Sequence, residues 1–369
     1  MLQRIFLPYF GAVIFALLIG AGCSKENPTI STYGSITGVV TDSISGIAIS
    51  GAAVLTNPAT SNVTTNTSGQ FTINGVNAGT YTITTSKIHY NRKSTEVSVT
   101  ASNTTNAYIA LSLVTVNIEW ITIPAGNFTM GSTTNDLNYN YDELPQHTVY
   151  LDDYQISKYE VTNAQYQAFM DDGGYSNSTY WTTDGWTWRT NSNTTEPDFW
   201  TSGNYNSGLA FPNYPVVGVN WYEAYAYCKW AGGSLSTEAQ WEKAARGTDA
   251  RYYPWGSTWD GLKCNSNDNV LPDTFTYSSQ VGYFSTGQSP YGVFDMAGNI
   301  WEWVNDWYQS DYYGISPTSN PTGPTSGSTG HVLRGGSFYG TSTNCRSAAR
   351  MYEYNTYLGD KIVGFRVVK

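Results

Sequence analysis

Charged residues are scarce in this sequence. Asp, Glu, Lys and Arg make up only 12% of its 369 residues, whereas ordinary domains contain about 25%. The 18 lysines and arginines form no cluster long enough to follow a phosphate backbone, which argues against nucleic-acid binding. Polarity comes mainly from hydroxyl and amide groups, which favours a protein that works outside the cytoplasm. The net charge of −10 serves either to attract cations or simply to keep the surface solvated.

Histidine and cysteine are also scarce. The three histidines are scattered, at His89, His147 and His331. The four cysteines are Cys23, Cys228, Cys264 and Cys345, and no CxxC pair occurs. A zinc site with the usual ligand spacing is therefore not supported. Three cysteines remain once Cys23 is set aside, so at least one thiol is unpaired unless the protein dimerises.

A long apolar run occurs only at the N-terminus. In MLQRIFLPYFGAVIFALLIGAGC, Arg4 is followed by an apolar stretch and then by small residues before Cys23. We predict that residues 1–22 are a secretory signal, because the run is too short for a membrane span. The cysteine after small residues resembles a bacterial lipoprotein signal, which implies acylation of Cys23 and a polar tether at 23–34. Ordinary cleavage near Cys23 and an uncleaved anchor remain alternatives.

Residues 35–113 consist of short alternating runs separated by turn residues. About seven short strands in this length predict a small β-sandwich. The pieces GVVTD, GAAV, TSGQFTI and AGTYTI occur in the order typical of the carboxypeptidase regulatory-like (transthyretin-like) domain. The segment resembles that family, which implies a spacer or adhesion module without catalysis. Residues 114–119 are predicted to be a linker.

Residues 120–369 form a second body of mixed structure. Its patterns predict helices at 162–174, 220–233 and 236–247, each preceded by a capping side chain or followed by glycine. Long stretches rich in Gly, Pro, Asn and Tyr lie between them, and loops of that length normally have a functional reason.

Nine ordered pieces in the second body resemble the sulfatase-modifying factor family, which includes the formylglycine-generating enzyme. The pieces are IP…GNFTMG (123–131), DELPQHTV (142–149), KYEVTNAQY (158–166), PVVGVNWYEA (215–224), LSTEAQWEKAARG (235–247), YPWG (253–256), YGVFDMAGNIWEW (291–303), LRGGSF (333–338) and GFRVV (364–368). The resemblance implies an α+β fold related to C-type lectins, with little regular secondary structure and bound calcium.

The resemblance also implies a test of catalysis. The enzyme oxidises a cysteine of client sulfatases with oxygen and a copper(I) ion held by two cysteines, because soft thiolates suit copper(I). The first of these lies three residues beyond the serine of the GGS segment, which here is Gly340. Alignment on RSAA (346–349) places Cys345 one residue before the matching arginine, at neither ligand position. We therefore expect no copper site.

The remaining cysteines have structural interpretations. Cys228 matches one half of a family disulfide whose partner position is Val367, so we predict a small buried apolar side chain on a helix. Cys345 is either structural, with a bridge to Cys264 as one possibility, or a reactive thiol. A nucleophilic cysteine needs a base, and His331 is the only histidine near it in sequence.

The resemblance also implies calcium binding. Calcium takes oxygen ligands from carboxylates and from carbonyls in tight turns, and the sequence offers both. One site is implied at the Glu302 side chain and the carbonyls of Ala297, Gly298 and Ile300. A second is implied at Asn265, the Ser266 carbonyl, and Asp268 or Asp273. The alternative for Glu302 is a pair with an arginine or a turn cap.

Trp303 and Ser337 match residues that line the substrate groove of the enzyme. The alternative for Trp303 is a place in the core, where tryptophan is commonly found.

We therefore expect a membrane-anchored lipoprotein of the cell envelope, facing the periplasm or the exterior, whose second domain binds protein or glycan without copper chemistry. An active oxidase with a site remodelled around Cys345 is the alternative. Iron-dependent sulfoxide synthases share this domain, but they carry iron-binding histidines on an added helical domain that the sequence lacks.

Overall fold

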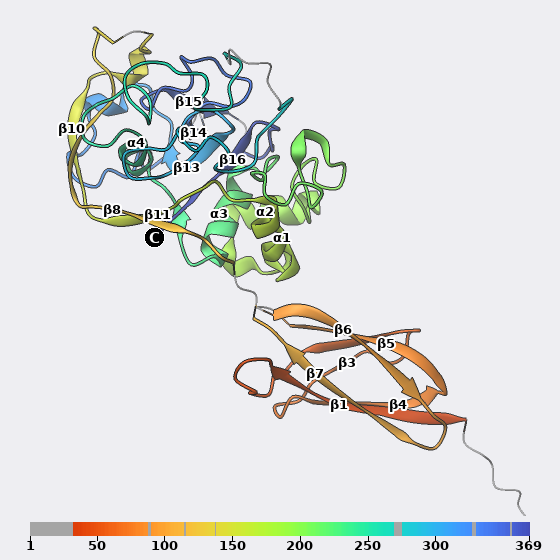
Figure 1. Ribbon diagram of the computed structural model, residues 1–369. Coiled ribbons are helices and arrows are strands. Elements are labelled where there is room, and N and C mark those ends of the chain that lie inside the picture. The colour runs from red at the N-terminus through yellow and green to blue at the C-terminus, as the bar shows by residue number, and fades with distance from the viewer. Residues whose placement is uncertain are drawn as a thin grey trace, which may run out of the picture.

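The computed structural model describes residues 32–369 except 88–89, 114–115, 137, 269–274, 327–329 and 355. The predicted signal, the acylation site at Cys23 and most of the predicted tether lie outside the described residues. The described chain forms two bodies, the first in red to orange and the second in yellow to blue (Figure 1). No helix within the described ranges is long and apolar enough to cross a membrane.

The first body is a β-sandwich of two sheets. Its strands are β1 (Tyr33–Asp42), β2 (Ala53–Asn57), β3 (Val63–Thr64), β4 (Gln70–Asn77), β5 (Gly79–Lys87), β6 (Tyr90–Val99) and β7 (Thr104–Leu111). One sheet has the order β4-β1-β7 and the other β3-β2-β5-β6. Alternate side chains such as Phe71 and Ile73 enter a core of their own, as the period of two predicts. The all-β prediction is confirmed.

The part of the second body that the structure describes contains three small sheets. Its strands are β8 (Trp120–Ile123), β9 (Gly126–Met130), β10 (His147–Leu151), β11 (Tyr154–Ser157), β12 (Ser234–Leu235), β13 (Trp301–Trp307), β14 (His331–Arg334), β15 (Arg350–Glu353), β16 (Val363–Phe365) and β17 (Val367–Val368). The sheets have the orders β12-β17-β11-β8, β15-β14-β13-β16 and β10-β9. The last strands therefore pair with early ones, which closes the body on itself.

The described residues of the second body also form four α-helices: α1 (Asn163–Asp171), α2 (Thr183–Ser192), α3 (Trp221–Trp230) and α4 (Glu238–Arg246). Short 3-10 turns occur at Tyr141–Glu143, Gly174–Ser176, Ser178–Tyr180, Asn204–Asn206 and Tyr312–Gly314. Thr162, Asn220 and Thr237 each begin a helix with a reciprocal capping box, which satisfies backbone donors that a helix start leaves free. The three predicted helices are confirmed.

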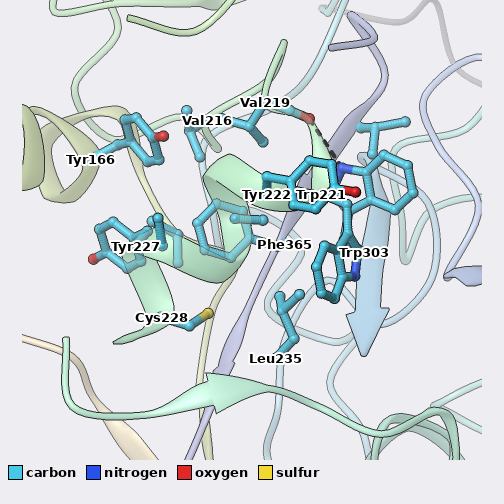
Figure 2. Close-up of a cluster of buried hydrophobic side chains, with 14 of the residues drawn as sticks. Tyr166, Val216, Val219, Trp221, Tyr222, Tyr227, Cys228, Leu235, Trp303 and Phe365 are labelled. Carbon is cyan, nitrogen blue, oxygen red and sulfur yellow. Dashed lines mark hydrogen bonds between the residues drawn. The ribbon is translucent and has the colours of Figure 1, made fainter. Parts of the chain in front are cut away.

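The core of the second body is largely aromatic. Figure 2 shows Tyr166, Tyr227 and Phe365 packed around α3, with the Cys228 thiol among apolar side chains. Tyr166 and Tyr227 stack with ring centroids 5.5 Å apart, an arrangement that adds to the stability from area burial. Cys228 is buried on α3, where the sequence placed it.

Candidate functional site

Cys345 lies in the interior of the second body. It is fully buried, and it packs with Cys264, Tyr253 and Ala297. Interaction with the neighbouring Cys264 thiol, together with burial, raises the pKa of Cys345 well above its usual value. The thiol therefore stays protonated at neutral pH, which is the reverse of what a nucleophilic cysteine needs.

His331 does not serve as a base for this thiol. Its ring is stacked between Trp221 and Trp307, with centroid distances of 3.9 and 4.0 Å, and its Nδ1 lies 3.2 Å from the carbonyl oxygen of Asn305. Burial lowers the pKa of His331 to about 3. The imidazole is therefore neutral over the physiological range and enclosed by indole rings.

The two residues expected to line a groove are both 1% exposed. Trp303 lies in the aromatic core, where its Nε1 donates a hydrogen bond of 3.0 Å to the carbonyl of Val219 (Figure 2). The Ser337 Oγ accepts from the backbone N–H of Tyr339 at 3.3 Å. The structure thus places Trp303 in the core, the alternative that the sequence left open.

The position of the first copper thiolate holds no ligand. Gly340 follows a tight turn in which its N–H donates to the Ser337 carbonyl at 2.8 Å. Its own carbonyl accepts from the N–H of Asn267, also at 2.8 Å. A hydrogen atom stands where a thiolate would be required, so the residues at the family position do not fit copper(I).

Glu302 is held in an ion pair. Its two carboxylate oxygens accept hydrogen bonds from Nε and a terminal nitrogen of Arg366 at 2.6 and 2.7 Å. The indole Nε1 of Trp241 donates a third, of 2.8 Å. All three side chains are buried. This is the arginine pairing given above as the alternative, and it leaves the carboxylate already well supplied with donors.

Two further carboxylates, which were not among the residues expected from the sequence, lie near this pair. Glu160 is buried, and its Oε2 accepts from the amide of Asn299 at 2.6 Å. Its Oε1 makes no hydrogen bond to any described residue. Burial, and the charges of Asp295 and Glu302, raise the pKa of Glu160 well above its ordinary value.

Asp295 completes this acidic cluster, which consists of Glu160, Asp295 and Glu302. Burial raises the pKa of Asp295 to about 6. Arg366 acts on all three carboxylates. The sequence signal was available, because Asp295 stands in the same glycine turn segment as Glu302 and Glu160 lies in KYEVTN.

Asn265 presents a buried oxygen atom that nothing in the described ranges satisfies. Its Nδ2 donates to the carbonyl of Tyr277 at 2.9 Å, while its Oδ1 has no hydrogen-bond partner there. An unsatisfied buried acceptor costs about 1–3 kcal/mol, and a hard cation would satisfy it. Ser266 beside it is buried. This half of the second predicted calcium site fits an oxygen-ligated cation.

The acidic partners of Asn265 are less well placed. Asp268 accepts two hydrogen bonds from Ser342, of 2.7 and 2.8 Å, through one carboxylate oxygen. Asp273 lies outside the described residues. The carbonyls of Ala297, Gly298 and Ile300 follow one another through the turn at Asn299, where Asn299 has a φ of 64°. The calcium ligand sets stay predictions.

Comparison with known proteins covers both bodies. Residues 112–369 match the model of the sulfatase-modifying factor enzyme 1-like domain, and residues 35–112 match that of the carboxypeptidase regulatory-like domain. A formylglycine-generating enzyme of Thermomonospora curvata is 35% identical over 271 residues, which cover 62% of this chain and 86% of that protein.

Other relatives carry different names. A hercynine oxygenase of Mycolicibacterium thermoresistibile is 33% identical over 243 residues, covering 62% of this chain and 53% of that protein. The structure of PvdO from Pseudomonas aeruginosa is similar with a TM-score of 0.51 and 24% identity, over 68% of this chain and 94% of that one. At that identity the likeness to PvdO supports the fold alone.

Proposed function

The chain belongs to the sulfatase-modifying factor enzyme 1-like domain family, and we propose that it is a non-catalytic member, a lipid-anchored envelope protein whose domain binds protein or glycan. The proposal is carried by one observation: the first copper-ligand position is Gly340, and the nearby Cys345 is a fully buried thiol engaged with Cys264. Without two available thiolates the oxygen chemistry has no metal to act through.

Anchoring through Cys23 is the second part of this proposal. It is supported by the apolar run and the small residues before Cys23, and by the polar tether that follows. The sandwich of residues 35–113 would hold the binding domain away from the membrane surface. Labelling cells with a radioactive fatty acid tests this, since the label should enter the chain and be lost in Cys23→Ala.

A direct assay separates the binding module from an enzyme. The chain is incubated with copper(I), oxygen and a sulfatase-type cysteine peptide, and the peptide is examined by mass spectrometry for the aldehyde. A formylglycine-generating enzyme serves as the positive control. We expect no product beside a working control. Aldehyde that forms with the wild-type chain and disappears in Cys345→Ser would overturn the proposal.

An oxidase remains the second candidate, and a specific arrangement favours it. In the family, the second copper-binding cysteine lies five residues after the first. Counted from Gly340, that position is Cys345, whereas alignment on residues 346–349 places Cys345 at neither ligand position. Cys264 then supplies another thiol in contact with Cys345. If this pair replaces the family pair, aldehyde formation should require both Cys264 and Cys345, and Cys228→Ser should keep full activity.

We further propose that the domain binds calcium. The unsatisfied oxygens of Asn265 and Glu160 support an oxygen-ligated divalent cation. Asn265 and Ser266 would be ligands of this ion, and Asn299 connects them to the acidic cluster through its hydrogen bonds with Asn265 and Glu160. The ion would supply structural cross-linking of these loops.

A further inference from the structure

Two cysteines from distant parts of the chain meet beneath an aromatic cover. Cys264 is 2% exposed and Cys345 is fully buried. Both pack with Tyr253, and the partly buried rings of Trp255 and Trp259 lie against the same cluster. The two cysteines belong to one small buried cluster, and the Cys264 thiol is close enough to raise the pKa of the Cys345 thiol. All described cysteines are free thiols in this structure.

The backbone on both sides fixes this contact. The N–H of Asn299 donates to the carbonyl of Asn265 at 2.8 Å, and the N–H of Asn267 donates to that of Gly340 at 2.8 Å. The segment that carries Cys264 is thus hydrogen-bonded both to the glycine turn and to the loop that carries Cys345. The two cysteines cannot drift apart without breaking these bonds.

Two glycines allow the close approach. Gly298 has a φ of 75°, and a Cβ placed on it would lie 2.2 Å from the Asn265 carbonyl oxygen and 3.3 Å from the Cys264 Cβ. Gly336 has a φ of 80°, and its added Cβ would lie 3.0 Å from the Cys345 sulfur. Left-handed backbone and lack of space both require glycine at these positions. The cysteine pair is therefore packed tightly from both sides.

Cys228 has no part in the pair. It lies on α3 in the aromatic core with Tyr227 and Leu235 (Figure 2). Burial raises the pKa of its thiol well above the ordinary value. The three described cysteines thus consist of one neighbouring pair and one isolated apolar thiol, and Cys228 offers a matched control.

We propose that Cys264 and Cys345 are a cross-linking site that closes to an intramolecular disulfide in the presence of a disulfide oxidant. Each sulfur loses its proton, one S–S bond forms, and the two electrons reduce the oxidant disulfide to two thiols. Both sulfurs are shielded in the folded chain, so exchange takes place while the loops are still open during folding. The composition already favours an extracytoplasmic setting, where disulfides persist.

The cross-link would fasten the loop of Asn265 to the segment after Ser337. It closes a long loop of the chain, so it should stabilise the second body appreciably. For a body of this size we expect the oxidised protein to melt roughly 5–10 °C above the reduced one. This inference does not depend on the proposed binding function, and an active oxidase would leave its test unchanged.

The test uses the full chain, refolded with oxidised glutathione and then unfolded in the presence of N-ethylmaleimide. After digestion, mass spectrometry should find one linked peptide pair that contains Cys264 and Cys345, while Cys228 carries the maleimide. Prior treatment with dithiothreitol should abolish the linked pair. Full alkylation of Cys228, Cys264 and Cys345, or a link that includes Cys228, would overturn the proposal.

Variants give a second readout. In Cys228→Ser the linked peptides and the melting difference between oxidised and reduced protein should be retained. In Cys264→Ser and in Cys345→Ser both should vanish. If either of these two variants fails to fold, wild type and Cys228→Ser are compared with and without dithiothreitol. Equal melting temperatures in the two redox states would contradict the proposed cross-link.

Discussion

Glu223 shows how one carboxyl group is accommodated among aromatic rings. It is buried on α3, and its two oxygens accept from the Tyr175 hydroxyl and from the N–H of Asn220 at 2.8 Å. Burial raises the pKa of Glu223 from 4.5 to about 8. The folded protein therefore keeps the proton on this group at neutral pH, whereas the unfolded chain releases it.

The sign of the pH dependence follows. The stability contributed by Glu223 is complete below pH 4.5 and is lost as the pH rises to about 8. The total loss should be roughly 3–5 kcal/mol, since each pKa unit corresponds to about 1.4 kcal/mol. Glu223→Gln is less stable at pH 5 because one acceptor is lost, but its free energy of unfolding should fall less between pH 5 and 8. Urea unfolding at both pH values measures this, and parallel profiles of variant and wild type would contradict it.

Asn265 supports a prediction about calcium. Saturating calcium should raise the melting temperature of the wild-type chain over that in a chelator by roughly 5 °C or more. Asn265→Ala should lose this increment, because it removes the unsatisfied Oδ1.

Asn163→Ala is the matched control. Asn163 is equally buried, its Nδ2 donates to two backbone carbonyls at 2.9 Å, and its Oδ1 also has no described partner. It lies at the start of α1, and its hydrogen bonds go to Asn206, Phe211 and Tyr214 rather than to the acidic cluster. The control should melt earlier than wild type yet retain the calcium increment. Loss of the increment in both variants would mean that Asn265 has no specific part in it.

At the residue scale, the sequence predicted the environment of single side chains better than it predicted which residues contact one another. Cys228 was placed correctly, and the pairing of Glu302 with an arginine was named as an alternative. Glu160 and Asp295 were overlooked because each becomes notable only when tertiary contacts bring Asn299 and Arg366 next to it. The places of Glu160 and Asp295 in the segments KYEVTN and YGVFDMAGN were the available sequence signal, but such a position does not by itself show that a carboxylate will be buried.

At the scale of elements, α4 is joined to two strands by buried ion pairs. Arg334 on β14 lies 2.6 Å from Glu242, and Arg350 on β15 lies 2.7 Å from Glu238. Glu242 also pairs with Arg246 on the next turn at 2.8 Å. Removing one partner of a buried pair leaves an uncompensated charge, which costs much more than the loss of an exposed pair.

Glu242→Gln should therefore destabilise the second body by about 3–5 kcal/mol, because it removes the negative charge that the buried Arg246 and Arg334 both pair with. Lys158→Met is the control, because its pair with Glu119 at 3.0 Å is partly exposed and should be worth about 1 kcal/mol or less. Urea unfolding followed by circular dichroism gives both values. A loss of equal size in the two variants would show that the buried pair is not a structural clamp.

The elements themselves were partly predictable. Helices α1, α3 and α4 carry capping boxes that are visible as T-x-x-Q or N-x-x-E in the sequence. Helix α2 was missed because Thr, Gly and Trp in TDGWTWRTNS neither favour helix nor form an apolar face. The two- to four-residue strands were also missed, since their pairing partners lie far away in the chain and no periodicity can develop over such lengths.

At the scale of the molecule, the two bodies have separate cores. Ile36, Phe71 and Ile109 belong to the sandwich cluster, whereas the aromatic core of the second body draws on α1 and α3. Cooperative unfolding usually follows such units. The full chain should accordingly show two calorimetric transitions, of which calcium shifts only the one that belongs to the second body.

Phe71→Ala identifies the other transition. It opens a cavity in the sandwich core, which should cost about 3–5 kcal/mol and lower only the transition that calcium does not shift. A single transition that calcium and Phe71→Ala both move would mean that the two bodies unfold as one unit.

The buried arginines have a consequence for the loop between them. Arg334 is fixed before this loop, and Arg346 and Arg350 are fixed after it, each in contact with a buried glutamate. Both anchorages lie outside residues 338–344, so substitutions in that loop remove no partner of the buried ion pairs. A chain built in this way can trade a metal-binding loop for an inert one, or be given one by design, while its architecture stays the same.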